Sequence, residues 1–425
     1  MVQFWEENSI FSSTQHAYRS NHSCTSYWMD LYSKIMSFRE GGWKVALLSL
    51  DLSSAFNCCS KKILIPKLKR LGFSDNALEI ITQFMTNRRV RVKVGETLSS
   101  EVILEDSTPE GGISSPSLFQ MLVLDFNALC KRIIDKCVAL QNSGLKISIG
   151  GTDSNEYADD SLLILAAKDD SSLQILINIA YEEAFGYFSS NNLLVNSSKS
   201  ELLVVGKSPG TKFFVNGIQD SDTMKLIGLR FDNKMNFLPQ ARYKAQQVAA
   251  KLSGLKRLSQ WASFSLCLQV ATSLLLSKLN HLLEIMGHSH VVQVVLQKSM
   301  NHILRIVTKG NNYSSVASML TQCNLLNIKN QCRYQSCLWF KKCVEKGVGK
   351  FTRGLLTSYD QRTRTDAFKL VFVPKLKISE HSFVVQGALI YRELNMSGVL
   401  HGSYKEMKNS VKFKILDRFP NGNIM

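Results

Sequence analysis

A nearly uninterrupted apolar run at residues 43–50, WKVALLSL, constrains the fold of this chain more than any other segment. A strand with one buried face alternates apolar and polar residues, whereas a continuous apolar run is typical of a strand covered on both faces. The run ends at Asp51. The sequence therefore predicts a central strand in a sheet with packed helices, and an acidic residue where that strand ends.

The segments around this strand predict a mixed α+β architecture. Helical spacing of apolar residues such as Leu78, Ile81 and Met85 indicates helices, and alternation of basic and apolar residues indicates a half-exposed strand. Helices are expected at 60–73, 75–87, 118–133 and about 171–188, and throughout the chain beyond Phe237. Strands are expected at 89–95 and 101–105 (as a hairpin), 146–151, 161–167, 201–206, 212–217 and 225–231.

Asp159 and Asp160 lie at or near the turn between two predicted strands, 108 residues after Asp51. Adjacent carboxylates repel each other and are tolerated best where cations neutralise them. Mg²⁺ prefers carboxylate oxygens and usually takes one or two of them together with phosphate oxygens. The pattern favours two Mg²⁺ (or Mn²⁺) ions that activate a 3′-hydroxyl and stabilise a leaving pyrophosphate. A strand-end Asp that only caps a turn is the simpler alternative.

The net charge of +17 is unevenly distributed along the chain. Residues 1–220 hold 21 Lys and Arg against 24 Asp and Glu, a balance of −3, whereas residues 221–425 hold 30 against 10, a balance of +20. A field of that sign attracts polyanions, so we expect nucleic acid as the partner. A solvated basic surface and an anionic membrane are the alternatives. The longest apolar stretch, VATSLLLSKLNHLLEIM, is interrupted by polar residues, so no membrane partner is expected.

Cys323, Cys332, Cys337 and Cys343 lie close together in the sequence, but the chain has no CxxC pair. Zinc sites require tightly paired ligands, so we expect no zinc and reduced thiols instead. The start of the chain, MVQFWEENSIF, has acids where a signal peptide would carry basic residues. We therefore expect an intracellular protein, in the nucleus and cytoplasm.

The segment YADD at residues 157–160, with Asp51 in LSLDLSSAF, resembles the catalytic core of reverse transcriptases. Further blocks resemble the same family in the same order: QHAYRSNHSCTS (15–26), TPEGGISSPSLF (108–119), NLLVNSSKSELLVVG (192–206) and MKLIGLRFD (224–232). The later segments SLLLSKLNHLLEIMGHS, LQKSMNHILRIVTKGNNYSS and SFVVQGALIYREL are similar to Jockey/CR1-like elements. The chain thus resembles the reverse transcriptase of a non-LTR (LINE-type) retrotransposon.

This resemblance implies an RNA-directed DNA polymerase whose partners are an RNA template, a DNA primer and dNTPs. It implies a right-hand polymerase fold, with a palm built on an antiparallel sheet with packed helices. The expected parts are partial fingers (1–43), the palm (44–237, with a finger-proximal insertion at 70–110), a helical thumb (238–310) and a basic helical C-terminal region (311–425). It also implies a chain truncated at its N-terminus, because the family's first fingers segments would precede Gln15.

The resemblance also implies roles for individual residues. Asp51 and Asp159 would bind metal with Asp160 as the second acid of the pair, and Lys199 would protonate pyrophosphate. Nucleotide or template would lie against Arg19, the Leu52 carbonyl, Phe56, Glu110, Gly111 and Gly112. Phe56 would exclude a ribose 2′-hydroxyl. The primer grip would be formed by Leu226, Ile227 and Gly228.

Each of these residues also has an ordinary structural interpretation, such as core packing for Phe56 or a solvated charge for Lys199. The sequence departs from the family pattern at Asn57, where an Asp is usual, and at Glu110, which replaces a Gln and adds a negative charge. Two hypotheses follow. The chain is a reverse transcriptase, or it is a degenerate or co-opted retrotransposon copy that binds nucleic acid without polymerase activity.

Overall fold

The computed structural model describes residues 2–8, 10–104, 106–109 and 111–346, and short pieces between 356 and 416. The chain divides into two compact units, Met1–Tyr27 with Ser37–Asp222, and Trp28–Met36 with Thr223–Met425. The predicted mixture of helices and sheets is confirmed. The division at Asp222 falls before the predicted end of the palm at residue 237, and the predicted domain boundaries stay a prediction.

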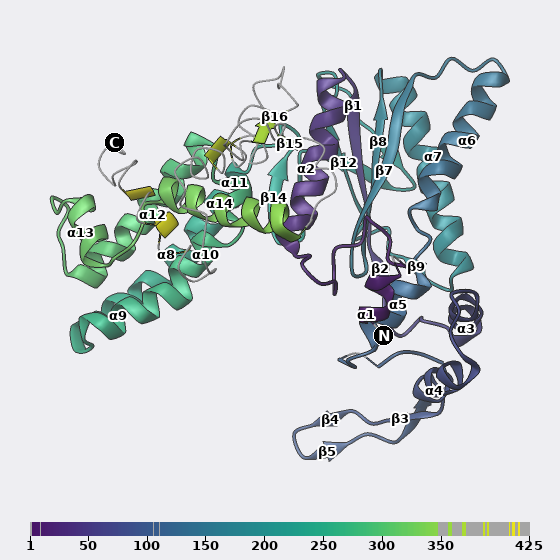
Figure 1. The fold of residues 1–425 in the computed structure, drawn as a ribbon, viewed down its shortest axis with the longest axis horizontal. Coiled ribbons are helices and arrows are strands. Elements are labelled where there is room, and N and C mark those ends of the chain that lie inside the picture. The colour runs from purple at the N-terminus through teal and green to yellow at the C-terminus, as the bar shows by residue number, and fades with distance from the viewer. Residues whose placement is uncertain are drawn as a thin grey trace. The chain divides into compact units, whose positions relative to one another are not determined.

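A six-stranded sheet forms the centre of the first unit, in the order β11-β12-β10-β1-β8-β7 (Figure 1). All of its pairs are antiparallel except β10 with β12. Its strands are β1 (Lys44–Leu50), β7 (Ile149–Tyr157), β8 (Asp160–Ala167), β10 (Glu201–Val205), β11 (Phe214–Val215) and β12 (Ile218–Ser221). Residues 45–48 of β1 are all 0% exposed, so this strand is covered on both faces, as its apolar run predicts.

Helices α7 (Asp170–Ser190) and α6 (Ala128–Asn142) form a layer on this sheet, where α7 contacts β1 and β8 and α6 contacts β7 (Figure 1). Further elements of the unit are α1 (Val2–Glu7), β2 (Leu52–Ser53), α3 (Lys61–Arg70), α4 (Asp75–Met85), α5 (Ser115–Leu122) and β9 (Leu194–Val195). The hairpin predicted after residue 88 is present as β3 (Arg88–Val90), β4 (Lys93–Val94), β5 (Thr97–Leu98) and β6 (Val102–Leu104).

Two elements of the first unit differ clearly from the sequence prediction. The helix expected at 118–133 is two helices, α5 and α6, because the chain turns between them at Asp125, whose carboxylate accepts hydrogen bonds from Lys67 and Tyr187. Residues 152–157, expected near the turn, are the second half of β7. Hydropathy misses this strand because its buried residues, among them Asn155 and Glu156, are polar and are satisfied by hydrogen bonds to distant segments.

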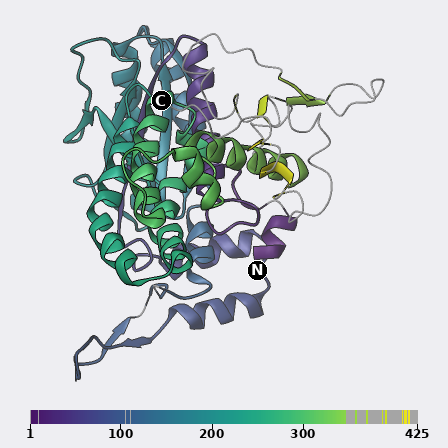
Figure 2. The same ribbon diagram turned by 90° about the vertical axis from the view of Figure 1, so that its left-hand side faces the viewer.

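Beyond Phe237 the second unit is mostly helical, and Figure 2 shows its teal and green helices gathered into one bundle. The prediction of helices throughout this region is wrong at residues 356–358 and 368–370, which form an antiparallel pair of short strands. The single strand predicted at 225–231 is instead a hairpin of β13 (Thr223–Leu226) and β14 (Leu229–Asp232), because the chain reverses at Ile227 and Gly228, which both have positive φ. Helix α8 (Leu238–Trp261) follows this hairpin. The rest comprises α9 (Phe264–Ala271), a π-helical turn (Thr272–Leu276), α10 (Ser277–Asn280), α11 (Leu283–Met286), α12 (His290–Thr308), α13 (Val316–Gln322), α14 (Ile328–Lys346), β15 (Leu356–Ser358) and β16 (Phe368–Leu370).

Helix α2 (Cys24–Glu40) contributes its middle part to this second unit, where Trp28 packs edge-on against Phe231. No helix in the described ranges has the length and hydropathy needed to cross a membrane. Most of the predicted C-terminal region beyond Lys346 lies outside the described residues.

Candidate active site

The strand register brings Asp51 to the turn of the β7–β8 hairpin. Strands β1 and β8 pair so that Leu50, the last residue of β1, lies opposite Ser161. Asp51 follows Leu50 and Asp160 precedes Ser161, so the two acids lie at the same end of this strand pair. Because Asp159 immediately precedes Asp160 in the turn, the structure gathers the three acids at one end of the sheet.

The hairpin turn itself has an unusual backbone. Tyr157 pairs with Asp160, which leaves Ala158 and Asp159 as a two-residue turn. Ala158 has a φ of 60°, a left-handed conformation that costs a residue with a Cβ about 1–2 kcal/mol. Strain of this kind persists only where neighbouring groups hold the backbone in place, and it concentrates at functional sites.

Asp51 has a buried carboxylate oxygen, Oδ2, that has no hydrogen-bond partner. Its backbone is fixed, because its N–H donates to Ser200 Oγ (3.2 Å) and its carbonyl accepts from Asn196 N (2.8 Å). An unsatisfied buried oxygen is unfavourable, and a bound cation would satisfy it.

Within the described part of the chain, no group of three or more His, Cys, Asp or Glu is gathered tightly enough to hold a metal ion. Mg²⁺ usually takes only one or two carboxylates and completes its shell with phosphate and water oxygens. The unpartnered oxygen of Asp51, beside a turn that carries two more acids, fits an ion of this kind.

The segment that carries Lys199 runs beside Asp51. Leu52 pairs with Val195 between β2 and β9, and a turn follows in which Lys199 N donates to Asn196 O (3.2 Å). The Lys199 side chain is exposed and Leu52 is buried. Both residues thus lie next to Asp51, and their roles stay predictions. Asn196 and Ser200 hold the Asp51 backbone, although the sequence predicted no role for them. Both residues lie in the segment 192–206, which also carries Lys199 and resembles a reverse-transcriptase block, and this position could have indicated their role.

Phe56 and the loop before α5 are tied together. The Phe56 carbonyl accepts hydrogen bonds from the Thr108 N–H (3.1 Å) and hydroxyl (3.0 Å), and its half-buried ring lies 5.4 Å from the ring of Phe119. Gly111 has a φ of 80°, which favours glycine. The predicted nucleotide contact Glu110 lies outside the described residues.

Gly112 leaves no room for a side chain, because a Cβ there would lie 2.6 Å from Ser115 Oγ and 2.9 Å from Pro109 Cγ. We expect Gly112→Ala to destabilise the fold by about 1–3 kcal/mol through overpacking. Gly186→Ala is the matched control, since a Cβ there meets nothing within 4 Å and α7 should gain about 0.5–1 kcal/mol. Denaturant unfolding measures the free energy of unfolding of both variants. Equal values would show that a side chain fits at residue 112.

Arg19 is occupied by contacts with protein. Its Nε and one terminal nitrogen donate to both carboxylate oxygens of Glu6 (3.1 and 3.0 Å), and the other donates to the carbonyls of Ser12 (2.7 Å) and Gln15 (3.1 Å). The guanidinium also lies over the ring of Phe11. These contacts favour a structural role for Arg19, and its predicted contact with template or nucleotide stays a prediction.

The predicted primer grip, Leu226, Ile227 and Gly228, forms the tip of the β13–β14 hairpin in the second unit. Ile227 and Gly228 both have positive φ (38° and 78°), which is rare for a β-branched residue such as Ile227. The buried Gln240 side chain holds this tip, because it donates to Gly228 O (3.1 Å) and accepts from Arg230 N (3.1 Å). The structure thus fixes the hairpin tip, and its grip on a primer stays a prediction.

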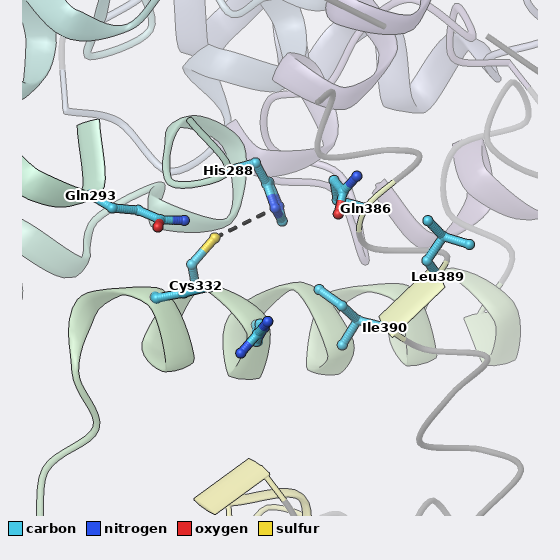
Figure 3. A pocket seen from close by; sticks show the side chains of 8 residues that line it. His288, Gln293, Cys332, Gln386, Leu389 and Ile390 are labelled. Carbon is cyan, nitrogen blue, oxygen red and sulfur yellow. Dashed lines mark hydrogen bonds between the residues drawn. The ribbon is translucent and has the colours of Figure 1, made fainter. Parts of the chain in front are cut away.

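A pocket of about 320 Å³ in the second unit is lined by Cys332 and His288 (Figure 3). Cys332 Sγ lies 3.7 Å from His288 Nε2, which also contacts Ser336 Oγ at 3.1 Å. Burial raises the pKa of the Cys332 thiol. The side chain of Cys343 lies outside the described residues. Among the described residues, no group of three or more His, Cys, Asp or Glu could hold a metal ion, and the predicted absence of zinc stays a prediction.

Comparison with known proteins gives consistent matches. The profile of the family described as "Reverse transcriptase (RNA-dependent DNA polymerase)" matches residues 1–231, more than half of the chain. The chain is also 26% identical over 200 residues to the retrovirus-related Pol polyprotein of the type-1 retrotransposable element R2 from Popillia japonica. That match covers 44% of this chain and 31% of the polyprotein, so the chain matches less than a third of its relative.

Similar solved structures include two telomerases. That of Candida albicans, in complex with a fragment of telomeric RNA, is 13% identical with a TM-score of 0.38, over 76% of this chain and 55% of that one. Apo telomerase from Candida Tropicalis is 11% identical with a TM-score of 0.36, over 83% of this chain and 54% of that one.

Proposed function

The chain belongs to the reverse transcriptase (RNA-dependent DNA polymerase) family, and on this premise we propose that it is the reverse transcriptase of a non-LTR retrotransposon and extends a DNA primer on an RNA template. One observation carries the proposal. The unpartnered, buried Oδ2 of Asp51 lies at the end of β1 beside the turn that carries Asp159 and Asp160. Acids collected from two distant segments, with one oxygen left unsatisfied, suit the binding of a divalent cation with a triphosphate.

Reverse transcriptases generally use divalent metal ions. We assign two Mg²⁺ (or Mn²⁺) ions to Asp51 and Asp159, with Asp160 as the second acid of the turn. Such ions favour ionisation of the primer 3′-hydroxyl and stabilise negative charge on the leaving pyrophosphate. The protein supplies the positions of the carboxylates: the register of β1 and β8 sets their separation, and the hydrogen bonds from Asn196 and to Ser200 fix the Asp51 backbone.

Lys199 is proposed to donate a proton to the leaving pyrophosphate. Its segment is anchored to Asp51 through Asn196, and its exposed ammonium is free of any described ion pair. A flexible cation near departing phosphates is suited to general-acid catalysis.

Extension of a labelled primer on an RNA template, with dNTPs and Mg²⁺ or Mn²⁺, tests the function. The proposal expects extension that a chelator abolishes. The alternative, a degenerate or co-opted copy, expects the chain to bind the same template–primer without extending it.

Phe56 is proposed to exclude ribonucleotides, because its half-buried ring follows Asp51 closely in the chain. Replacing Phe56 with Ala removes the ring, and we expect incorporation of rNTP relative to dNTP to rise by about 10- to 200-fold, the usual range for discrimination at one small group. The matched control is Phe185→Ala, which removes a half-exposed ring from α7. Equal ratios in both variants would show that Phe56 only packs against the core.

A further inference from the structure

A short segment near the N-terminus, Ser12–Ala17, lies against the end of β7 and holds the turn of the acids. The segment forms a parallel bridge to the strand between Gln15 and Glu156. Glu156 N donates to Thr14 O (2.9 Å), and His16 N donates to Glu156 O (3.0 Å). The segment is therefore bridged to the β7 edge of the sheet at this one point.

The Gln15 side chain reaches from this segment to the turn. Its Oε1 accepts hydrogen bonds from Ala158 N (3.1 Å) and Ala17 N (2.9 Å), and its Nε2 donates to Ala158 O (3.5 Å). Gln15 is only 3% exposed. A carboxamide provides both an acceptor and a donor, so one side chain holds the N–H and the C=O of the same turn residue.

The segment that carries Gln15 is itself anchored. Arg19 donates to the carbonyls of Ser12 and Gln15 while it is paired with Glu6, and Gln120 of α5 donates to Ala17 O (2.7 Å). Thr14 also donates to the buried carboxylate of Glu156 (2.7 Å). Gln15 therefore approaches the turn from a fixed backbone, which makes its hydrogen bonds effective in fixing the position of Ala158.

We infer that Gln15 is a positioning residue for metal binding: it holds Ala158 in its left-handed conformation so that Asp159 presents its carboxylate beside Asp51. The inference rests on the proposed function only in treating these acids as metal ligands. Without the two hydrogen bonds, Ala158 relaxes toward a less costly φ, and the carboxylate of the next residue moves with it. Groups that orient a metal ligand typically contribute about 10- to 100-fold to metal affinity or activity.

The test compares Gln15→Met with Gln174→Met in the full chain. The Gln174 side chain also makes hydrogen bonds with both the N–H and the C=O of one residue: it accepts from Phe214 N (3.2 Å) and donates to Phe214 O (2.7 Å). Gln174 lies on α7 and Phe214 on strand β11, so this pair is not part of the turn that carries the acids. Binding of Mn²⁺ is measured by electron paramagnetic resonance without substrate, and primer extension is measured separately as kcat and as KM for template–primer.

We expect Gln15→Met to weaken Mn²⁺ binding and lower kcat, each by about 10- to 100-fold, with KM unchanged, whereas Gln174→Met changes neither. Adding Ala158→Gly to Gln15→Met should restore most of the loss, because glycine adopts this φ without strain. Gln15→Asn, a shorter amide, serves if Gln15→Met does not fold, with the same expected loss.

The inference would be overturned if Gln15→Met had the same Mn²⁺ affinity and kcat as Gln174→Met. It would also be overturned if adding Ala158→Gly to Gln15→Met restored neither quantity. If the natural sequence binds Mn²⁺ but extends no primer, the proposed function fails, and a weakened affinity in Gln15→Met still supports the positioning role.

Discussion

Replacing Asp51 with Asn is expected to lower primer extension by at least about 10³-fold, which corresponds to about 4 kcal/mol of transition-state stabilisation. The amide removes the negative charge from the atom that faces the proposed ions. The same change should leave the stability of the metal-free protein equal or slightly higher, because the wild-type Oδ2 is buried without a partner. Extension rates and denaturant unfolding without metal measure the two effects.

Asp220→Asn is the matched control for this prediction and should behave in the opposite way. Asp220 is also buried, but its carboxylate is paired with Lys207 and accepts a hydrogen bond from Phe213 N (3.0 Å). Loss of a buried charge partner costs about 3–5 kcal/mol of stability, while extension by the folded fraction should persist. If both variants lost similar stability and Asp51→Asn still extended primers, Asp51 would have no role in catalysis.

A second large effect is expected from α8, which carries basic residues and no Asp or Glu over its 24 residues. Four of these cations are exposed: Arg242, Lys251, Lys256 and Arg257. Proteins hold an RNA–DNA hybrid mainly through its phosphates and shape. We therefore propose that α8 contacts the template–primer backbone, and that replacing all four with Gln weakens binding most strongly at low salt.

The slope of log affinity against log salt concentration should fall by about one for each phosphate contact that is lost, so by up to about four. The control replaces Lys69, Lys131, Arg132 and Lys136, whose charges are already paired with carboxylates of the first unit. If the salt slope were unchanged in the α8 variant, or fell equally in both variants, the basic residues of α8 would not contact the template–primer and would serve only solubility.

Local patterns in the sequence predicted much of the fold. The apolar run of β1, the helical spacing in α3, α4 and α7 and the alternation in the 88–104 hairpin each arise from nearby residues, and all of these elements are present. The reverse transcriptase family predicted from the sequence blocks is confirmed by the profile match over residues 1–231.

Contacts between distant residues were not predictable from such patterns. Gln15 and Ala158 are 143 residues apart, and the buried polar end of β7 resembles a loop when hydropathy alone is considered. The sequence predicted that Asp51 and the acid pair belong to one site. It did not predict that the Asp51 backbone is held by Asn196 and Ser200, or that the Ala158 N–H donates a hydrogen bond to the Gln15 side chain. Side-chain hydrogen bonds to backbone groups leave no periodic signal in the sequence.

Asp51 and the Ala158–Asp160 turn are thus proposed to form a metal site for RNA-templated DNA synthesis. The most direct measurement is single-turnover addition of one dNTP to a primer on an RNA template, across a Mn²⁺ titration, with the natural sequence and Asp159→Asn. We expect saturable, Mn²⁺-dependent addition by the natural sequence and none detectable with Asp159→Asn, although both bind the template–primer equally. The metal site would be ruled out if both proteins added the nucleotide at the same rate, and the polymerase function would be ruled out if the natural sequence bound the template–primer tightly without addition.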